Sequence, residues 1–245
     1  MNLPNSIVSD KSLKSILILG VLTVIGTSLI TQIMLQTGEN VREYSVDLSD
    51  QVPGSDNYFN SLAVYPNGLP PYISSGGVYS PEITIFNIGF KIAGMLFIFI
   101  GIEAFLRTAS SLNLDDKKEH NFNNISLACS IISGILVFSI TFFPFDKKLM
   151  PHVVIAMLIF IFISIWVYSF MMARKKLDTE IMFRGRSINE IRHKIALFGF
   201  FSFLFMCFFV SLNMHSIGAI GEWGLMLTSQ LQTLSFIPNL NKKIN

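Results

Sequence analysis

Apolar residues occur along this chain in six long, nearly uninterrupted runs separated by polar segments. Each run is close to the ~20 residues that an α-helix needs to cross the ~30 Å hydrocarbon core of a bilayer. Within the runs the apolar positions lack the period-two alternation of a transmembrane β-strand. The pattern therefore predicts an all-α integral membrane protein whose 245 residues form one six-helix domain. The predicted spans are about 14–36, 83–106, 125–145, 151–172, 194–213 and 216–238.

The composition supports this class and excludes others. Hydrophobic residues make up 51% of the chain and charged residues 14%, against about 25% charged in a soluble domain. The net charge of +2 comes from basic residues scattered among the loops, so nucleic acid is not an expected partner. Cys129 and Cys207 both fall within apolar runs, so we expect neither a disulfide framework nor a cysteine-based zinc site.

The basic residues predict the orientation of the bundle. Lys11 and Lys14 precede the first run, which is long enough to span and has no small-residue cleavage site after it, so we expect a retained signal anchor. Almost all other basic residues fall in every second connection between the six spans, which puts them on one side of the membrane. Lys147 and Lys148 are the main exception. The positive-inside rule then places both termini in the cytoplasm.

The loop between the first two spans, residues 37–82, faces away from the cytoplasm in this orientation. It is acidic, with Arg42 as its sole basic residue, and it carries aromatic residues spaced among Pro and Gly. This composition predicts a folded cap on the membrane surface rather than a free linker. At its end, Pro81 and Glu82 begin the second span, where a proline suits the first helical turn and a carboxylate suits the positive helix end.

Ionisable groups inside a membrane are costly, so their depths guide the search for a site. Lys91 and Glu222 lie at similar depths from the outer ends of their spans, which predicts an ion pair. The topology brings further polar residues to the same level, so we expect a lipid-headgroup site, an acid/base centre or polar contacts between helices. The candidate residues are Glu82, Asn87, Lys91, Asp146, His152, His215 and Glu222.

Other chemistry has less support. A zinc site built from histidines and carboxylates lacks any recognised ligand spacing, so we expect no metal, no cofactor and no assigned catalytic residue. Glu103 is four residues before Arg107, a spacing that predicts a local ion pair. The basic run 173–194 fits either contact with anionic lipids or ordinary topological charge.

The end of the long loop carries a specific motif. It reads PYISSGG over residues 71–77, then Ser80, Pro81 and Glu82, followed by Ile85 and Phe86. This stretch resembles the P-x-I-S-D-T-G-x-x-P-P-E signature of the Frag1/DRAM/Sfk1 family, which includes TMEM150 proteins and the N-terminal part of Cwh43-like proteins. Ser75 and Gly76 stand where that family has Asp-Thr, which removes the signature's own carboxylate.

The resemblance implies a six-span protein with a lipid-related role in autophagy, phosphoinositide or GPI-anchor remodelling processes. We therefore expect a non-enzymatic membrane protein that binds or organises lipid and recruits membrane or cytosolic proteins. A lipid-remodelling enzyme and a transporter or channel are the alternatives. The expected location is an endomembrane (lysosome, Golgi or ER) or the plasma membrane.

Overall fold

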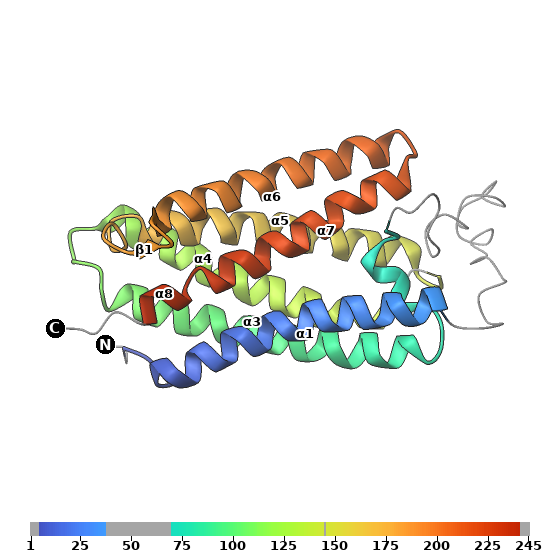
Figure 1. Ribbon diagram of the computed structural model, residues 1–245, viewed down its shortest axis with the longest axis horizontal. Helices are drawn as coiled ribbons and strands as arrows, with labels where there is room; N and C mark the ends of the chain where they lie inside the picture. The colour runs from blue at the N-terminus through green and yellow to red at the C-terminus, as the bar shows by residue number, and fades with distance from the viewer. Residues whose placement is uncertain (1–4, 38–69, 145, 241–245) are drawn as a thin grey trace.

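The computed structural model describes residues 5–37, 70–144 and 146–240, and within these ranges the chain forms a bundle of long helices (Figure 1). The predicted all-α membrane fold is confirmed. The predicted aromatic cap falls mainly on residues 38–69, outside the described residues. The elements are α1 Asp10–Thr37, η1 Ile73–Gly77, α3 Glu82–Ala109, α4 Lys117–Ser139, η2 Ile140–Phe142, α5 Leu149–Arg174, β1 Met182–Phe183, β2 Arg186–Ser187, α6 Ile188–Ser211, α7 His215–Leu234 and α8 Ile237–Leu240.

Five of these helices, α1, α3, α4, α5 and α6, are long and apolar enough to cross a membrane. The sixth predicted span corresponds to α7, which has 20 residues and ends at Leu234, four residues earlier than predicted. The third span was predicted from residue 125, but α4 already begins at Lys117. A helix can extend beyond the hydrocarbon because its polar first turns reach into water or headgroups.

The long helices alternate in direction along the bundle (Figure 1). Extensive contacts join α1 to α3, α3 to α4 and α4 to α5, while α6 packs mainly on α7. The α6–α7 pair therefore forms a hairpin that meets the other long helices through fewer contacts, α6 against α5 and α7 against α1 and α5. We call the end that carries η1 the η1 end, and the opposite end, with α8 and the β1–β2 hairpin, the basic end (Figure 1).

Close packing of α3 on α4 depends on small residues. A Cβ added to Gly94 would lie 2.5 Å from the carbonyl oxygen of Gly134, so neither backbone could approach as closely with a larger residue. Helices in a bilayer gain little from the hydrophobic effect on association, and close backbone approach increases the dispersion contacts that replace it.

The helix α7 carries polar side chains along its membrane-length run, and these side chains face protein. The hydroxyl of Thr228 donates to the Gly224 carbonyl over 2.9 Å, and the amide of Gln232 donates to the Val167 carbonyl on α5 over 3.3 Å. These bonds satisfy groups that hydrocarbon could not. The buried polar residues of α7 are Glu222, Thr228, Ser229, Gln230, Gln232 and Thr233.

At the basic end, Asp178 is buried between two arginines. Its carboxylate accepts hydrogen bonds from Arg174 over 2.7 and 2.8 Å, and it also pairs with Arg192, whose side chain is fully buried. Arg192 donates to the hydroxyl and carbonyl of Ser235 and to the amide oxygen of Asn239, each over 3.0 Å. This cluster, the Asp178 network, ties the α5–α6 connection to α6 and to the end of α7.

A second network holds the start of the chain. The predicted ion pair between Glu103 and Arg107 is present, with 3.0 Å between Nε and Oε2. The Glu103 carboxylate also accepts the backbone N–H groups of Ile7 and Val8 over 2.6 and 2.9 Å. Arg107 pairs in addition with Asp10. One buried carboxylate thereby fixes the segment before α1 against α3.

We expect Asp178→Asn to lower the free energy of unfolding by about 3–5 kcal/mol, because it leaves two buried guanidinium groups without their shared anion. The measurement is thermal unfolding of the purified protein in detergent. Glu190→Gln is the matched control, since Glu190 pairs with Lys194 at the same end but is 51% exposed. That substitution should change the stability by less than ~0.5 kcal/mol.

The stability that Asp178 contributes should depend on pH. Burial alone would raise the pKa of Asp178, but the hydrogen bonds and charges of Arg174 and Arg192 outweigh burial and lower the pKa below its ordinary value of 3.8. In acid the unfolded chain then binds more protons than the folded chain, so this contribution is complete above about pH 4 and lost as the pH falls through the lowered pKa. Parallel pH profiles for the wild type and Asp178→Asn would contradict the assignment.

Candidate functional site

The loop before α3 is bound firmly to the bundle. The side-chain amide of Gln32 on α1 donates to the Tyr72 carbonyl over 3.0 Å and to the Ser75 hydroxyl over 2.9 Å. The indole N–H of Trp223 on α7 donates to the Pro71 carbonyl over 3.0 Å. The loop segment 70–77 is therefore a packed part of the structure at the η1 end.

A small residue is required within η1. A Cβ added to Gly76 would overlap the side chain of Thr31 on α1, which lies directly against the loop. Ser75, which precedes it, is fully buried and donates its hydroxyl hydrogen to the Tyr72 carbonyl over 2.7 Å. These two positions pack against α1, so their small side chains serve the docking of the loop.

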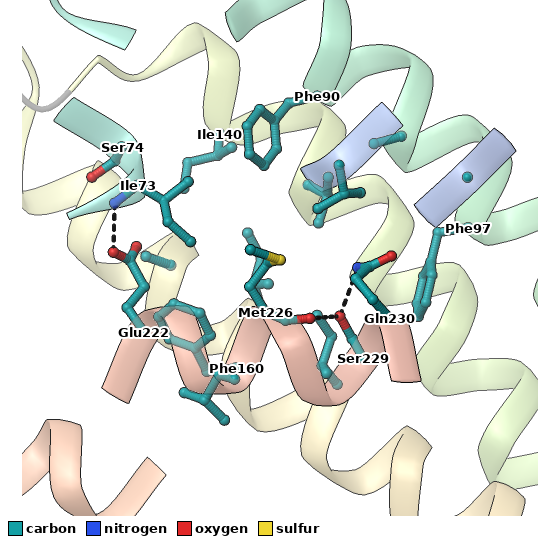
Figure 2. Close-up of a pocket in the computed structure, with 18 of the residues that line it drawn as sticks. Ile73, Ser74, Phe90, Phe97, Ile140, Phe160, Glu222, Met226, Ser229 and Gln230 are labelled. Atoms are coloured by element: carbon teal, nitrogen blue, oxygen red, sulfur yellow. Dashed lines mark hydrogen bonds between the residues drawn. The ribbon is translucent and has the colours of Figure 1, made fainter. Parts of the chain in front are cut away.

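Glu222 on α7 also binds this loop, in addition to the residues of α1. Its carboxylate accepts the backbone N–H of Ile73 over 2.7 Å, and the residue is only 7% exposed (Figure 2). The donor and acceptor are 149 positions apart in the sequence. A carboxylate on α7 thus satisfies a backbone donor of η1 inside the protein.

The predicted ion pair between Lys91 and Glu222 is wrong, since the described residues show no such contact. The Lys91 ammonium instead lies 4.6 Å from the ring centre of Phe142 and 6.0 Å from that of Phe138. Phe86 on α3 packs with Ile73 of η1 and Met226 of α7, whereas Lys91, five residues later, faces the end of α4. The two residues lie at similar depths, but the Lys91 side chain is directed toward the end of α4 and the Glu222 side chain toward η1.

Two predicted histidines do meet Glu222 around one hollow. His152 on α5 is 6% exposed, and its Nδ1 lies 2.7 Å from the Phe143 carbonyl oxygen, so Nδ1 donates there. His215, the first residue of α7, has its Nδ1 3.4 Å from the Tyr72 hydroxyl. Both imidazoles therefore have polar contacts within the protein while they line the same space.

This space, the η1-end cavity, has a volume of about 440 Å³. Ligand sites in proteins commonly measure about 300–1,000 Å³ and combine apolar walls with a few polar groups, and the η1-end cavity has both properties. Its polar lining is Tyr72, Ser74, His152, Ser211, His215 and Glu222. Its apolar lining comes from α5 and α6, with Leu149, Val153, Ala156, Met157, Phe160, Met206, Cys207 and Val210.

A smaller interior cavity of about 110 Å³ adjoins it within the bundle (Figure 2). Its walls are mainly apolar, and Ser229 and Gln230 of α7 bring polar groups to it. The Gln230 amide donates to the Ser229 hydroxyl over 2.9 Å, as Figure 2 shows. Ser74 and Glu222 line both hollows, so Glu222 lies where the two meet.

The other candidate residues lie apart from the cavity. Among the described residues that line it, Glu82, Asn87, Lys91 and Asp146 do not appear. Glu82 is fully buried in the first turn of α3, and Asp146 lies in the connection between α4 and α5. Burial raises the pKa of Asp146, and the nearby Lys147 charge only partly offsets this.

Sequence reasoning missed the groups that hold the loop in place. Gln32 carries a detectable signal, because an amide within an apolar run is costly unless it has a partner in the protein. Tyr72 and Ser74 lie within the motif of the loop, but nothing in the spacing shows that they face α5 and α6. The arrangement offers donors and acceptors at one end of an apolar hollow, which suits an amphiphilic molecule.

A model of the Frag1/DRAM/Sfk1/Cwh43P N-terminal domain matches residues 51–243. The chain is also similar to "Modulator of macroautophagy TMEM150B-B" from Xenopus laevis, with 27% identity over 154 residues. That alignment covers 62% of this chain and 63% of the relative, so the matched region spans less than two thirds of the relative. No solved structure matches.

We expect Glu222→Ala to lower the free energy of unfolding by about 1–3 kcal/mol, because the buried N–H of Ile73 loses its acceptor. Glu222→Gln keeps an acceptor oxygen and should remain closer to the wild type. The measurement is thermal unfolding in detergent.

A double-mutant cycle provides the control. Lys91→Met and Glu222→Ala should add within about 0.5 kcal/mol, because the two side chains do not touch. A larger coupling energy would support an ion pair between Lys91 and Glu222. Equal losses of stability in Glu222→Gln and Glu222→Ala would contradict the role of the acceptor oxygen.

Proposed function

Because the chain belongs to the Frag1/DRAM/Sfk1/Cwh43P N-terminal domain family, we propose that it is a non-enzymatic multi-pass membrane protein that binds lipid and recruits partners. The observation that carries this proposal is the η1-end cavity, an apolar hollow with polar groups gathered at one end. We propose that the cavity receives the headgroup and the upper acyl chain of a membrane lipid.

The lining of the cavity supports an amphiphilic occupant. Val153 and Val210 line the cavity and are 43% and 36% exposed, so its α5 and α6 walls reach the outer surface of the bundle. At the polar end, Tyr72 and Ser74 provide hydroxyl groups, and Glu222 provides a carboxylate. This set favours a headgroup that offers hydroxyl groups or a cation over one that is only anionic.

The membrane process in which this chain acts is proposed from the name of the Xenopus relative. The Xenopus protein is named as a modulator of macroautophagy, and we propose that this chain acts in a membrane process of that kind. Phosphoinositide-related and GPI-lipid-related roles are the other processes that the sequence resemblance implies, and the recruited partners would be membrane or cytosolic proteins.

A lipid-remodelling enzyme is the second candidate. The observation that favours it is His152, whose Nδ1–H is directed to the Phe143 carbonyl, so Nε2 is the basic nitrogen of a ring that lines the cavity. Such an imidazole can accept a proton from a water or a lipid hydroxyl. A transporter has less support, because Lys91 packs on aromatic rings of α4 and η2 and Glu103 is held by backbone N–H groups.

We also propose that the basic end faces the cytoplasm, in an endomembrane or the plasma membrane. The support is the positive-inside rule, since most of the described basic residues lie at that end, in the helix ends and the connections there. The chain before α1 and the chain after α8 would then both be cytoplasmic.

We expect Ala156→Phe to reduce the lipid that co-purifies with the protein by about one molecule per chain, because Ala156 lines the cavity and the added ring would occupy it. The measurement is mass spectrometry of lipids extracted from protein purified in mild detergent. Val154→Phe is the matched control on the same helix, because Val154 is 52% exposed and does not line the cavity.

Two results would oppose the lipid-binding proposal. Equal lipid content in Ala156→Phe and Val154→Phe would show that the η1-end cavity is not the lipid-binding site. Turnover of added phospholipid by the wild type, lost in His152→Ala with folding intact, would favour the enzyme instead.

The orientation predicts different accessibility of two inserted tags. In intact vesicles with the cytoplasmic face outward, protease should remove a tag placed after Asn245 and should not reach a tag placed between residues 38 and 69. Detergent should make both tags accessible. Protection of the C-terminal tag alone would invert the proposed orientation.

A further inference from the structure

The consecutive helices α5 and α6 leave a long hollow between them. Although they adjoin in sequence, each makes its extensive contacts elsewhere, α5 with α4 and α6 with α7. Toward the basic end the space between them is a groove of about 860 Å³, with α7 as its floor. Apolar residues of this basic-end groove include Ile161, Ile165, Val167, Leu197, Phe200 and Leu225.

We propose that the basic-end groove binds an anionic glycerophospholipid from the membrane leaflet at that end, with its phosphate beside Lys175 and an acyl chain along α5 and α6. This is a second site, separate from the η1-end cavity. It extends the proposed lipid-binding function and rests on the membrane-spanning helices rather than on occupancy of the η1-end cavity.

The length and exposure of the groove suit an acyl chain. Its α5 wall runs from Ile161 to Lys175, roughly 20 Å at 1.5 Å per residue, while one leaflet contributes about 15 Å of hydrocarbon. Ile161, Ile165 and Phe200 are 40%, 39% and 54% exposed, so the groove opens sideways between apolar helix faces. A lipid can therefore enter it from the bilayer.

The charges of the groove select an anionic headgroup. Its basic lining residues are Lys175 and His193, both exposed at the basic end, and no carboxylate lines it among the described residues. The nearby acids Asp178 and Glu190 are engaged by Arg174 and Lys194 respectively. The Lys175 ammonium forms no ion pair in the described part of the chain, so it can meet a phosphate at the mouth.

The sideways opening and the charge of the groove favour a lipid over another protein segment. The opening lies between apolar faces of membrane-spanning helices, and the Lys175 ammonium lies at its mouth. An acyl chain with an anionic headgroup matches both features.

The test uses the full chain, freed of lipid in detergent and titrated with dioleoylphosphatidylglycerol or dioleoylphosphatidylcholine, with bound lipid counted by native mass spectrometry. We expect the wild type to bind phosphatidylglycerol more tightly, and Lys175→Ala to weaken that binding about five-fold without affecting phosphatidylcholine. Lys194→Ala is the charge-matched control and should change it by less than about two-fold. Lys175→Arg should keep the preference.

A second pair of variants tests the groove itself. Ala196→Trp adds a large side chain to the lining and should abolish the tight phosphatidylglycerol site, whereas Leu204→Trp, on the lipid-facing side of α6, should not. Each variant must show an unfolding temperature close to that of the wild type. Ala156→Phe, at the η1-end cavity, should leave this site intact, so the two proposals can fail separately.

Three outcomes would overturn the proposal. The first is equal binding of the two lipids by the wild type, and the second is equal loss in Lys175→Ala and Lys194→Ala. The third is a dimer that persists without lipid and is disrupted by Ala196→Trp, which would assign the groove to a second copy of this chain.

Discussion

The structure depends on one constraint, which is that polar groups inside a bilayer need partners within the protein. The helix α7, which has six buried polar residues, therefore lies against η1, α1, α5 and α6 rather than facing lipid alone. Its carboxylate at Glu222 accepts the N–H of Ile73, and its amide at Gln232 donates to the Val167 carbonyl. Satisfying these groups determines which face of α7 is turned inward.

The same requirement places polar attachments toward both ends of the α6–α7 hairpin. At the basic end, Asp178 and Arg192 join α6 to the end of α7 through buried charges. At the η1 end, Glu222 and Trp223 hold the loop before α3. Between these attachments α6 packs on α7 and makes few contacts with α5, and both hollows lie along that boundary.

The sequence predicted what depends on composition and on local spacing. Apolar runs identified the helices, and the Glu103–Arg107 pair was found because residues four apart share a helix face. The Lys91–Glu222 pair was wrong because depth along a helix says nothing about rotation around its axis. The partners of Glu222 and Arg192 could not be predicted either, since one is a loop N–H and the other comes from a connection between helices.

The sideways opening of the space between α5 and α6 determines how any occupant would reach it. Ile161, Ile165 and Phe200 present the opening to the membrane interior rather than to water. A ligand then arrives by diffusion within the plane of the bilayer, and its occupancy follows its mole fraction among the lipids instead of its aqueous concentration. For the proposed lipid, a change in membrane composition alone would alter the occupied fraction of the groove.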